Sequence, residues 1–248
     1  MSGSDSLAQR LSLDGRIALV TGASGGIGRK VVSLLASAGA RVAAVDRPGS
    51  TPGTGAELTL EADLANPAEV RRVASEVNER LGGIDHVIHA AGITRDGVLW
   101  KLTEEDWDDV IAVNLSSGFH LLKATIPILR ARGGGSIVLF ASINGERGHF
   151  GQANYAASKA GVIALTRCTA KEVGRFNIRV NAVSPGYIHS PMTEGLPPEL
   201  LQMAVDETAL GRMGEPRHVA DAVLFLCSSL SEHITGQVLR IDGGQLMV

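Results

Sequence analysis

Short apolar runs alternate with amphipathic segments along the chain. Seven of these runs have the length and the Val, Ile, Leu and Ala content of buried strands. They cover residues 16–21, 41–46, 57–64, 84–92, 135–142, 177–186 and 237–244. Strands that are apolar on both sides are typical of parallel sheets covered by helices on both faces. The pattern therefore predicts an α/β fold with a doubly wound, seven-stranded parallel sheet.

Helical periodicity fills most of the intervals between these runs. It predicts helices over 29–39, 68–82, 103–132, the segment around Tyr155, and 215–230. Residues 47–57 are different, because two prolines and three glycines predict an irregular connection. With no repeat or linker, we expect one Rossmann domain over 14–248, a flexible leader over 1–13 and a substrate lid at about 187–210.

Composition narrows the possible functions. The 248 residues are 44% hydrophobic and 20% charged with a net charge of -3, so no basic field attracts nucleic acid. No apolar run is long enough to span a bilayer, and the N-terminus lacks the features of a secretory signal. Cys168 and Cys227 lie in apolar helical patterns, which predicts buried free thiols in a reducing cytoplasm.

A glycine cluster directly follows the first predicted strand and precedes a helix. Gly22, Gly25, Gly26 and Gly28 allow backbone N–H groups and a helix N-terminus to approach a phosphate. Asp46 ends the second strand, eighteen residues past Gly28, where a dinucleotide fold places a carboxylate for ribose hydroxyls. This carboxylate favours NAD, while the adjacent Arg47 leaves NADP open.

Other strands end at the same edge of the sheet. Asp63 ends the third strand beside the expected adenine, and the small residues 90–92 end the fourth, where a cofactor could lie against backbone. His89 is interpreted as a packed strand residue, because no second ligand stands at metal-binding spacing. The segment from Tyr187 to Gly211 carries several apolar residues and fits a lid, with a surface helical hairpin as the alternative.

Tyr155 and Lys159 lie four residues apart in a predicted helix, so both side chains share one face. A free phenol has a pKa near ~10. A neighbouring ammonium is expected to lower this pKa toward the working range of an acid/base catalyst. Ser142 ends the fifth strand, where it could hold a substrate oxygen. Asn114 lies in a mostly apolar helix, either as a core hydrogen-bonding group or as a functional one.

The motifs together resemble the short-chain dehydrogenase/reductase family of the classical type. They are T-G-A-S-G-G-I-G at 21–28, Asp46, Asp63-Leu64, A-A-G at 90–92, Asn114, Ser142, Y-A-A-S-K at 155–159 and Pro185-Gly186. Within that family the chain looks most similar to the beta-ketoacyl-ACP reductases, through A-G-I-T-R-D-G at 91–97, G-Q-A-N-Y-A-A-S-K-A-G-V-I at 151–163, L-G-R-M-G-E-P at 210–216 and I-T-G-Q-V-L-R-I-D-G-G at 234–244.

The resemblance implies a role for each matched residue. Tyr155 would be the general acid/base, Lys159 would lower its pKa and bind the nicotinamide ribose, Ser142 would orient the carbonyl, and Asn114 would hold a water of a proton relay. The cofactor contacts implied are Gly22, Ser24, Gly25, Gly26, Ile27, Gly28, Asp46, Arg47, Asp63, Leu64, Ala90, Ala91, Gly92, Tyr155, Lys159, Pro185, Gly186, Ile188 and Thr193. Family members are usually homotetramers.

The expected activity is NAD-linked reduction of a 3-oxoacyl thioester, carried by CoA or acyl carrier protein, to the (3R)-hydroxy product. Family members commonly have N-N-A-G where this chain has His89-Ala90-Ala91-Gly92, so a side-chain contact from position 90 is absent. The alternatives are a dehydrogenase for a steroid, a sugar or another secondary alcohol, and a non-catalytic NAD-binding subunit.

Overall fold

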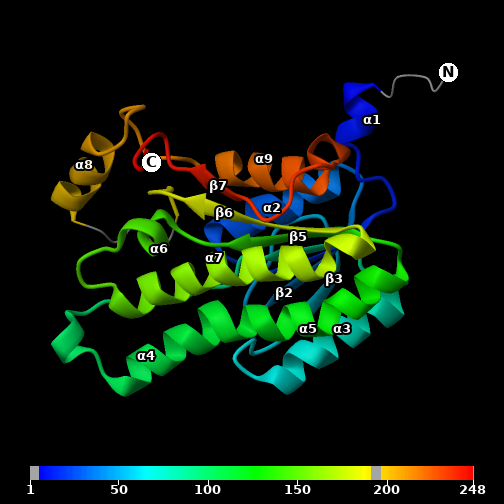
Figure 1. Cartoon of the computed structure of the whole chain (residues 1–248), viewed down its shortest axis with the longest axis horizontal. Helices are drawn as coiled ribbons and strands as arrows, with labels where there is room; N and C mark the ends of the chain where they lie inside the picture. Colours follow the sequence, from blue (N-terminus) through cyan, green and yellow to red (C-terminus); the bar gives the residue numbers. More distant parts are fainter. Residues whose placement is uncertain (1–5, 191–196, 248) are drawn as a thin grey trace.

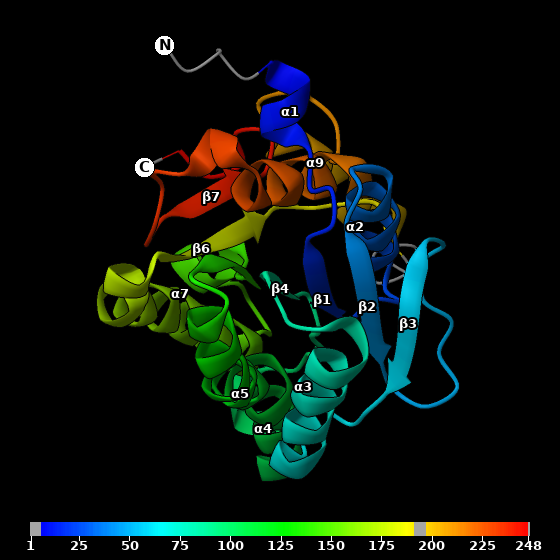
Figure 2. The ribbon, with the colours of Figure 1, turned by 90° about the vertical axis from the view of Figure 1, so that its right-hand side faces the viewer.

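A parallel sheet of seven strands forms the centre of the structure, a computed structural model that describes residues 6–190 and 197–247. The strand order is β3-β2-β1-β4-β5-β6-β7. Figures 1 and 2 show the twisted sheet between two layers of helices. The predicted fold class is confirmed. The strands are β1 (Ile17–Thr21), β2 (Arg41–Asp46), β3 (Ala56–Glu61), β4 (His86–His89), β5 (Gly135–Phe140), β6 (Ile178–Pro185) and β7 (Val238–Ile241).

The helices connect these strands and cover both faces of the sheet. The α-helices are α1 (Leu7–Leu11), α2 (Gly26–Ser37), α3 (Pro67–Leu81), α4 (Glu104–Ile111), α5 (Ser117–Ala131), α6 (Ile143–Arg147), α7 (Ala153–Val173), α8 (Pro198–Asp206) and α9 (Pro216–Cys227). Shorter helical turns are η1 (Leu99–Lys101), η2 (Ala112–Ser116), η3 (Gly174–Phe176) and η4 (Ser229–Ser231). As predicted, β2 and β3 are joined without a helix.

Alternation along each strand divides the core into two layers. In β1, Ile17 and Leu19 pack in the layer that also holds residues of α3, α5 and α7. Ala18 and Val20 point to the opposite face and pack with residues of α2 and α9. All four side chains are nearly or completely buried. Burial on both faces explains why the strand is apolar throughout.

The strand order reverses between β1 and β4. β1 pairs with β2 on one side and with β4 on the other, so the chain crosses over the sheet between them. The loops that follow β1 and β4 therefore diverge at the carboxyl edge of the sheet. In an open α/β sheet this point is where a ligand binds.

Two expectations from the sequence differ from the structure. The stretch 1–13 is predicted to be a flexible leader, yet within its described part, residues 6–13, Ser6 caps the short helix α1, and Leu13 is buried in the α2 layer. Hydrogen bonds between Arg10 and Ser229 also connect α1 to η4. Cys227 is buried as predicted, but Cys168 is exposed. The helix α7 is apolar over much of its surface, so its sequence does not separate the buried face from the outer face.

The long helix predicted over 103–132 is interrupted by a π turn. Thr103 caps α4, with its side chain accepting a hydrogen bond from the Asp106 amide, and α4 then runs into the π-helical turn η2 before α5 begins. Such turns insert extra backbone into a helix and are frequent at functional sites. Within the described residues, no helix is long and apolar enough to cross a membrane.

Candidate active site

The glycine turn between β1 and α2 is packed too tightly for side chains. A Cβ on Gly28 would lie 2.0 Å from the carbonyl oxygen of Gly22, and a Cβ on Gly22 would lie 2.6 Å from the amide nitrogen of Ala91. Gly22 also has a φ of 67°, which favours glycine. Close by, the hydroxyl oxygen of Ser24 is buried and has no partner among the described residues. A cofactor phosphate or hydroxyl would supply that partner, so this turn fits a dinucleotide.

Asp46 at the end of β2 is held against this turn. Its carboxylate accepts hydrogen bonds from the backbone amides of Ser24, at 2.7 Å, and of Arg47, at 2.8 Å. Both oxygens are thus fixed by backbone rather than by a mobile side chain. The Arg47 side chain is exposed. The carboxylate lies at the end of β2 beside the glycine turn, and its binding of ribose hydroxyls stays a prediction.

The third strand leads into the site through Asp63 and Leu64. The Asp63 carboxylate accepts a hydrogen bond from the Ala65 amide at 3.0 Å, and its own amide donates to Glu69 at 2.9 Å. These bonds form the turn into α3, and Leu64 is buried beneath it. Asp63 therefore shapes the edge of the sheet beside Asp46.

Gly92 brings the loop after β4 into contact with the predicted catalytic groups. A Cβ at this position would lie 3.3 Å from Oδ1 of Asn114 and 3.4 Å from Nζ of Lys159. The preceding residues, Ala90 and Ala91, lie against the glycine turn at Gly22. Small residues thus line the stretch between the glycine turn and Lys159.

The Lys159 side chain, on α7, is buried, and burial shifts its pKa. Its ammonium donates a hydrogen bond to the carbonyl of Phe140, at the end of β5, over 2.8 Å. Nζ also lies 5.6 Å from the centre of the Tyr155 ring, so the two side chains share one face as predicted. Burial lowers the pKa of Lys159 to about 8.

Tyr155 and Ser142 are brought together at the carboxyl end of β5. Ser142 caps the short helix α6, its hydroxyl accepting a hydrogen bond from the Asn144 amide at 3.2 Å. Burial raises the pKa of Tyr155, a hydrogen bond with Ser142 offsets part of this rise, and the charge of Asp96 adds to it. The direction is opposite to the lowering expected from Lys159. The phenol is accordingly held in its protonated form.

Asn114 is fully engaged within the π turn. Its Oδ1 accepts a hydrogen bond from the Ile93 amide at 2.8 Å, and its Nδ2 donates to the Ile93 carbonyl at 3.0 Å and to Oγ of Ser158 at 3.1 Å. The side chain therefore fixes the loop after β4 to α7. The sequence left open whether Asn114 has a structural or a functional role, and these hydrogen bonds show a structural one.

His89 is a packed strand residue, as the sequence indicated. Its Nδ1 lies 2.8 Å from Oγ1 of Thr21, and its Nε2 lies 2.9 Å from Oγ of Ser117. Burial, with a contribution from the charge of Lys159, lowers the pKa of His89 to about 3. The ring is therefore neutral and joins β1, β4 and α5. No cluster of three potential metal-ligating side chains occurs in the part of the chain that the structure describes.

The end of β6 closes the far side of the site. The Gly186 amide donates to the Ile241 carbonyl at 3.1 Å, and a Cβ on Gly186 would lie 2.6 Å from Oε1 of Gln245. Pro185 and Ile188 are buried on either side, and Ile188 pairs with Gly214. Thr193 and the part of the predicted lid over 191–196 lie outside the described residues. In the rest of the predicted lid, Pro198–Asp206 forms the helix α8.

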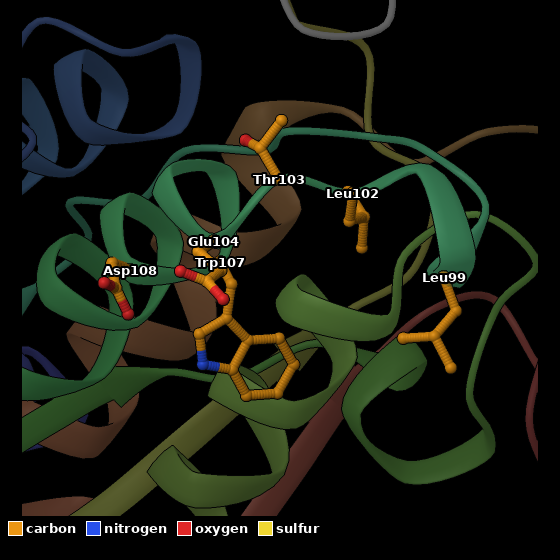
Figure 3. A pocket seen from close by; sticks show the side chains of 6 residues that line it. All are labelled: Leu99, Leu102, Thr103, Glu104, Trp107 and Asp108. Atoms are coloured by element: carbon orange, nitrogen blue, oxygen red, sulfur yellow. The ribbon is translucent and has the colours of Figure 1, made fainter.

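Three polar residues beside this cluster were missed by the sequence analysis. Asp96, Asn144 and Gln152 are joined by hydrogen bonds close to Ser142 and Tyr155. The positions of Asn144, two residues after Ser142, and of Gln152, three before Tyr155, are a signal that could have indicated these two residues. A separate hollow of about 280 Å³ lies at the start of α4 (Figure 3) and contains none of the predicted site residues; it is lined by Leu99, Leu102, Thr103, Glu104, Trp107 and Asp108.

Comparisons with known proteins agree over almost the whole chain. A family model described as enoyl-(acyl carrier protein) reductase matches residues 22–245. The chain is 42% identical over 245 residues to 3-oxoacyl-[acyl-carrier-protein] reductase FabG of Thermotoga maritima, covering 94% of this chain and 99% of the relative. It is 42% identical over 259 residues to (3R)-3-hydroxyacyl-CoA dehydrogenase of Mus musculus, covering 97% and 100%. FabG of Escherichia coli is 37% identical over 248 residues, covering 96% and 100%.

Proposed function

Because the chain belongs to the short-chain dehydrogenase/reductase family and is an oxidoreductase, we propose that it reduces a 3-oxoacyl thioester to the (3R)-3-hydroxyacyl thioester. The observation that carries the proposal is the meeting of Ser142, Tyr155 and Lys159 beside a glycine turn built for a dinucleotide. The names of the relatives support the substrate class, since they include both acyl-carrier-protein and CoA enzymes.

The proposed chemistry divides between cofactor and protein. A bound nicotinamide cofactor supplies the hydride for the carbonyl carbon. Tyr155 donates the proton to the carbonyl oxygen, and its raised pKa keeps the proton available for reduction. Ser142, which shares a hydrogen bond with Tyr155, holds the same oxygen. Holding the reacting groups together supplies much of the rate enhancement.

Lys159 and Asn114 would support the proton transfer. The Lys159 ammonium carries three hydrogens and gives one to the Phe140 carbonyl, so the others would be available to a ribose hydroxyl. The Asn114 side chain is occupied by Ile93 and Ser158, so a relay water would be held by the Asn114 backbone carbonyl within the π turn. This assignment refines the role that the family resemblance implies.

We propose NAD as the preferred cofactor. The Asp46 carboxylate is fixed by the amides of Ser24 and Arg47, so it can accept hydrogen bonds from ribose hydroxyls but would repel a 2'-phosphate. We propose the same edge of the sheet for the other cofactor contacts that the resemblance implies. Among the described residues these are Gly22, Ser24, Gly25, Gly26, Ile27, Gly28, Arg47, Asp63, Leu64, Ala90, Ala91, Gly92, Tyr155, Lys159, Pro185, Gly186 and Ile188.

Both CoA and acyl carrier protein remain within the proposal as thioester carriers. Arg132, one of the cations near the glycine loop before β5, is bound to Asp85 at 3.0 Å. Arg130 lies over the ring of Phe176 at 4.3 Å, and Lys171 is exposed on α7. These two cations would be available to an acidic carrier.

A homotetramer is the proposed assembly. Phe119 on α5 is 48% exposed and Trp107 on α4 is 40% exposed, and the outer face of α7 includes Ala160 and Ala164. A second copy of the chain would remove this apolar surface from water. The two free cysteines suit a reducing compartment, for which we propose the cytoplasm.

Steady-state rates with acetoacetyl-CoA test the proposed function. The protein should oxidise NADH on adding acetoacetyl-CoA, and Tyr155→Phe should lower kcat by roughly 10²–10⁴-fold because the proton donor is lost. NADH affinity should stay near that of the unchanged protein. Retained turnover would remove Tyr155 from the mechanism. Turnover only with steroid, sugar or simple alcohol substrates would assign a different dehydrogenase, and NADH binding without turnover would indicate the non-catalytic subunit.

A further inference from the structure

A continuous row of hydrogen-bonded side chains, here called the polar belt, lies beside Ser142 and Tyr155. It consists of Asp96, Gln152, Asn144, Arg147, Glu207 and Gln245. Along the belt, Gln152 Nε2 donates to Asp96 at 3.0 Å, Asn144 Nδ2 to Gln152 at 2.9 Å, Arg147 to Asn144 at 3.2 Å and to Glu207 at 3.0 Å, and Gln245 to Glu207 at 2.9 Å. It joins the loop after β4, α6, the start of α7 and the end of α8, and α6 and α8 are at the same edge in Figure 1.

Two amides of the belt are neighbours of the groups that would hold the ketone. Asn144 lies in the first turn of α6, and its backbone amide donates to the Ser142 hydroxyl at 3.2 Å. Gln152 directly precedes the first residue of α7, three residues before Tyr155, and its side chain makes no capping hydrogen bond. The two side-chain amides are therefore candidates for contact with the functional group next to a ketone whose oxygen contacts Ser142 and Tyr155.

Each of these amides has an unused donor. A carboxamide nitrogen carries two hydrogens. Among the described residues, Nδ2 of Asn144 gives one to Gln152, and Nε2 of Gln152 gives one to Asp96. Arg147 fixes the Asn144 oxygen, so the amide nitrogens are oriented by the belt itself. A carbonyl oxygen is the complementary ligand for such free N–H donors.

The charges of the belt select among carbonyl compounds. Asp96 adds negative charge beside Gln152, and this charge also contributes to the raised pKa of Tyr155. The positive charge of Arg147 is paired with Glu207. The nearby His149 bonds to the Tyr187 hydroxyl at 3.3 Å. Asp96 would thus repel a substrate carboxylate at this place, whereas a neutral thioester carbonyl carries no charge to be repelled.

We propose that Asn144 and Gln152 form the subsite for the second carbonyl of the substrate, the thioester C=O one methylene away from the ketone, and that Asp96 behind them excludes free 3-oxo acids. The inference rests on the proposed function, and it explains how the proposed reductase would select its substrate. A site built to hydrogen-bond a polar group strongly rejects analogues that lack it. The belt would therefore distinguish 3-oxoacyl thioesters from simple ketones and from 3-oxo carboxylates.

The test compares acetoacetyl-CoA with 3-oxobutyl-CoA, the thioether made from CoA and methyl vinyl ketone, which keeps the ketone and lacks the second carbonyl. Asn144→Leu and Gln152→Met should each lower kcat/KM for acetoacetyl-CoA by roughly tenfold, the effect of one lost hydrogen bond. The thioether, followed by its turnover or by its inhibition constant, should change by less than about twofold. Asn78→Leu, an exposed amide on α3, is the matched control and should change neither.

A second arm tests the exclusion of carboxylates. Asp96→Asn keeps an acceptor for Gln152 and removes the charge, so the use of acetoacetate relative to acetoacetyl-CoA should rise by roughly tenfold. Equal losses on thioester and thioether in the first arm, or an unchanged acetoacetate ratio in the second, would overturn the subsite. An unchanged protein that does not reduce acetoacetyl-CoA with either cofactor would instead defeat the proposed function.

Discussion

The carboxylate of Asp46 provides the sharpest test of cofactor choice. Two backbone amides hold it, at 2.7 and 2.8 Å, so it cannot rotate away from an incoming 2'-phosphate without losing both hydrogen bonds. Two unit charges about 5 Å apart repel by about 3 kcal/mol at an effective dielectric constant of about 20. Solvent and salt at this partly exposed edge reduce the repulsion to about 2 kcal/mol. NADH should therefore be favoured over NADPH by roughly 30-fold in kcat/KM.

Asp46→Asn removes the charge and keeps the size of the side chain. The preference for NADH should then fall by at least roughly tenfold, mainly because NADPH improves. Steady-state kinetics with both cofactors and one ketone substrate measure the ratio. Glu57→Gln is the control, since this carboxylate pairs with Arg41 at the other end of β3. A protein that prefers NADPH, or an Asp46→Asn variant with an unchanged ratio, would refute the reasoning.

Two further predictions concern Lys159 and Asp85. Because burial lowers the pKa of Lys159 to about 8, kcat/KM for reduction should decline above about pH 8 as the ammonium is lost. Its pKa in the unfolded chain is higher, so the cost of burying its charge is relieved as the pH rises from about 8 to 10.5, and this group should not lower the melting temperature while activity falls. A flat activity profile up to pH 10 would contradict the assignment. Asp85 is 3% exposed and binds Arg132 and the Ile17 amide at the amino end of β4. Asp85→Ala should cost about 3 kcal/mol, lowering the melting temperature by about 5–10 °C with kcat unchanged per folded molecule. Thermal denaturation measures the melting temperature, and the control Glu57→Ala should change it little. Equal melting temperatures for Asp85→Ala and the unchanged protein would show that the buried pair of Asp85 and Arg132 is dispensable.

The sheet and its carboxyl edge could be predicted because they depend on local patterns. Continuous apolar runs such as residues 41–46 identify strands buried on both faces, and helical periods between them require parallel pairing. Spacing alone then placed Tyr155 and Lys159 on one face. These inferences needed no knowledge of which segments touch.

The remaining features depend on tertiary packing. The hydrogen bonds of the Asn114 side chain are made with Ile93 and Ser158, which are distant in sequence. The exposure of Cys168 depends on which side of α7 faces the sheet, and α7 is apolar over much of its surface. The rise in the pKa of Tyr155 follows from burial, which a four-residue spacing does not report. The polar belt could not be predicted either, because its hydrogen bonds join residues that are distant in sequence.

The π turn of η2 fixes the number of residues allowed between Thr103 and α5. Deleting one residue there would restore an ordinary α-helix but rotate α4 by about 100° relative to α5. The Thr103 cap would then leave its place, and Asn114 would turn away from Ile93. The irregular connection over 47–55 contains no helix, so a change in its length would not rotate one helix relative to another. Insertions and deletions should therefore accumulate in that connection during evolution, while the length of η2 stays constant.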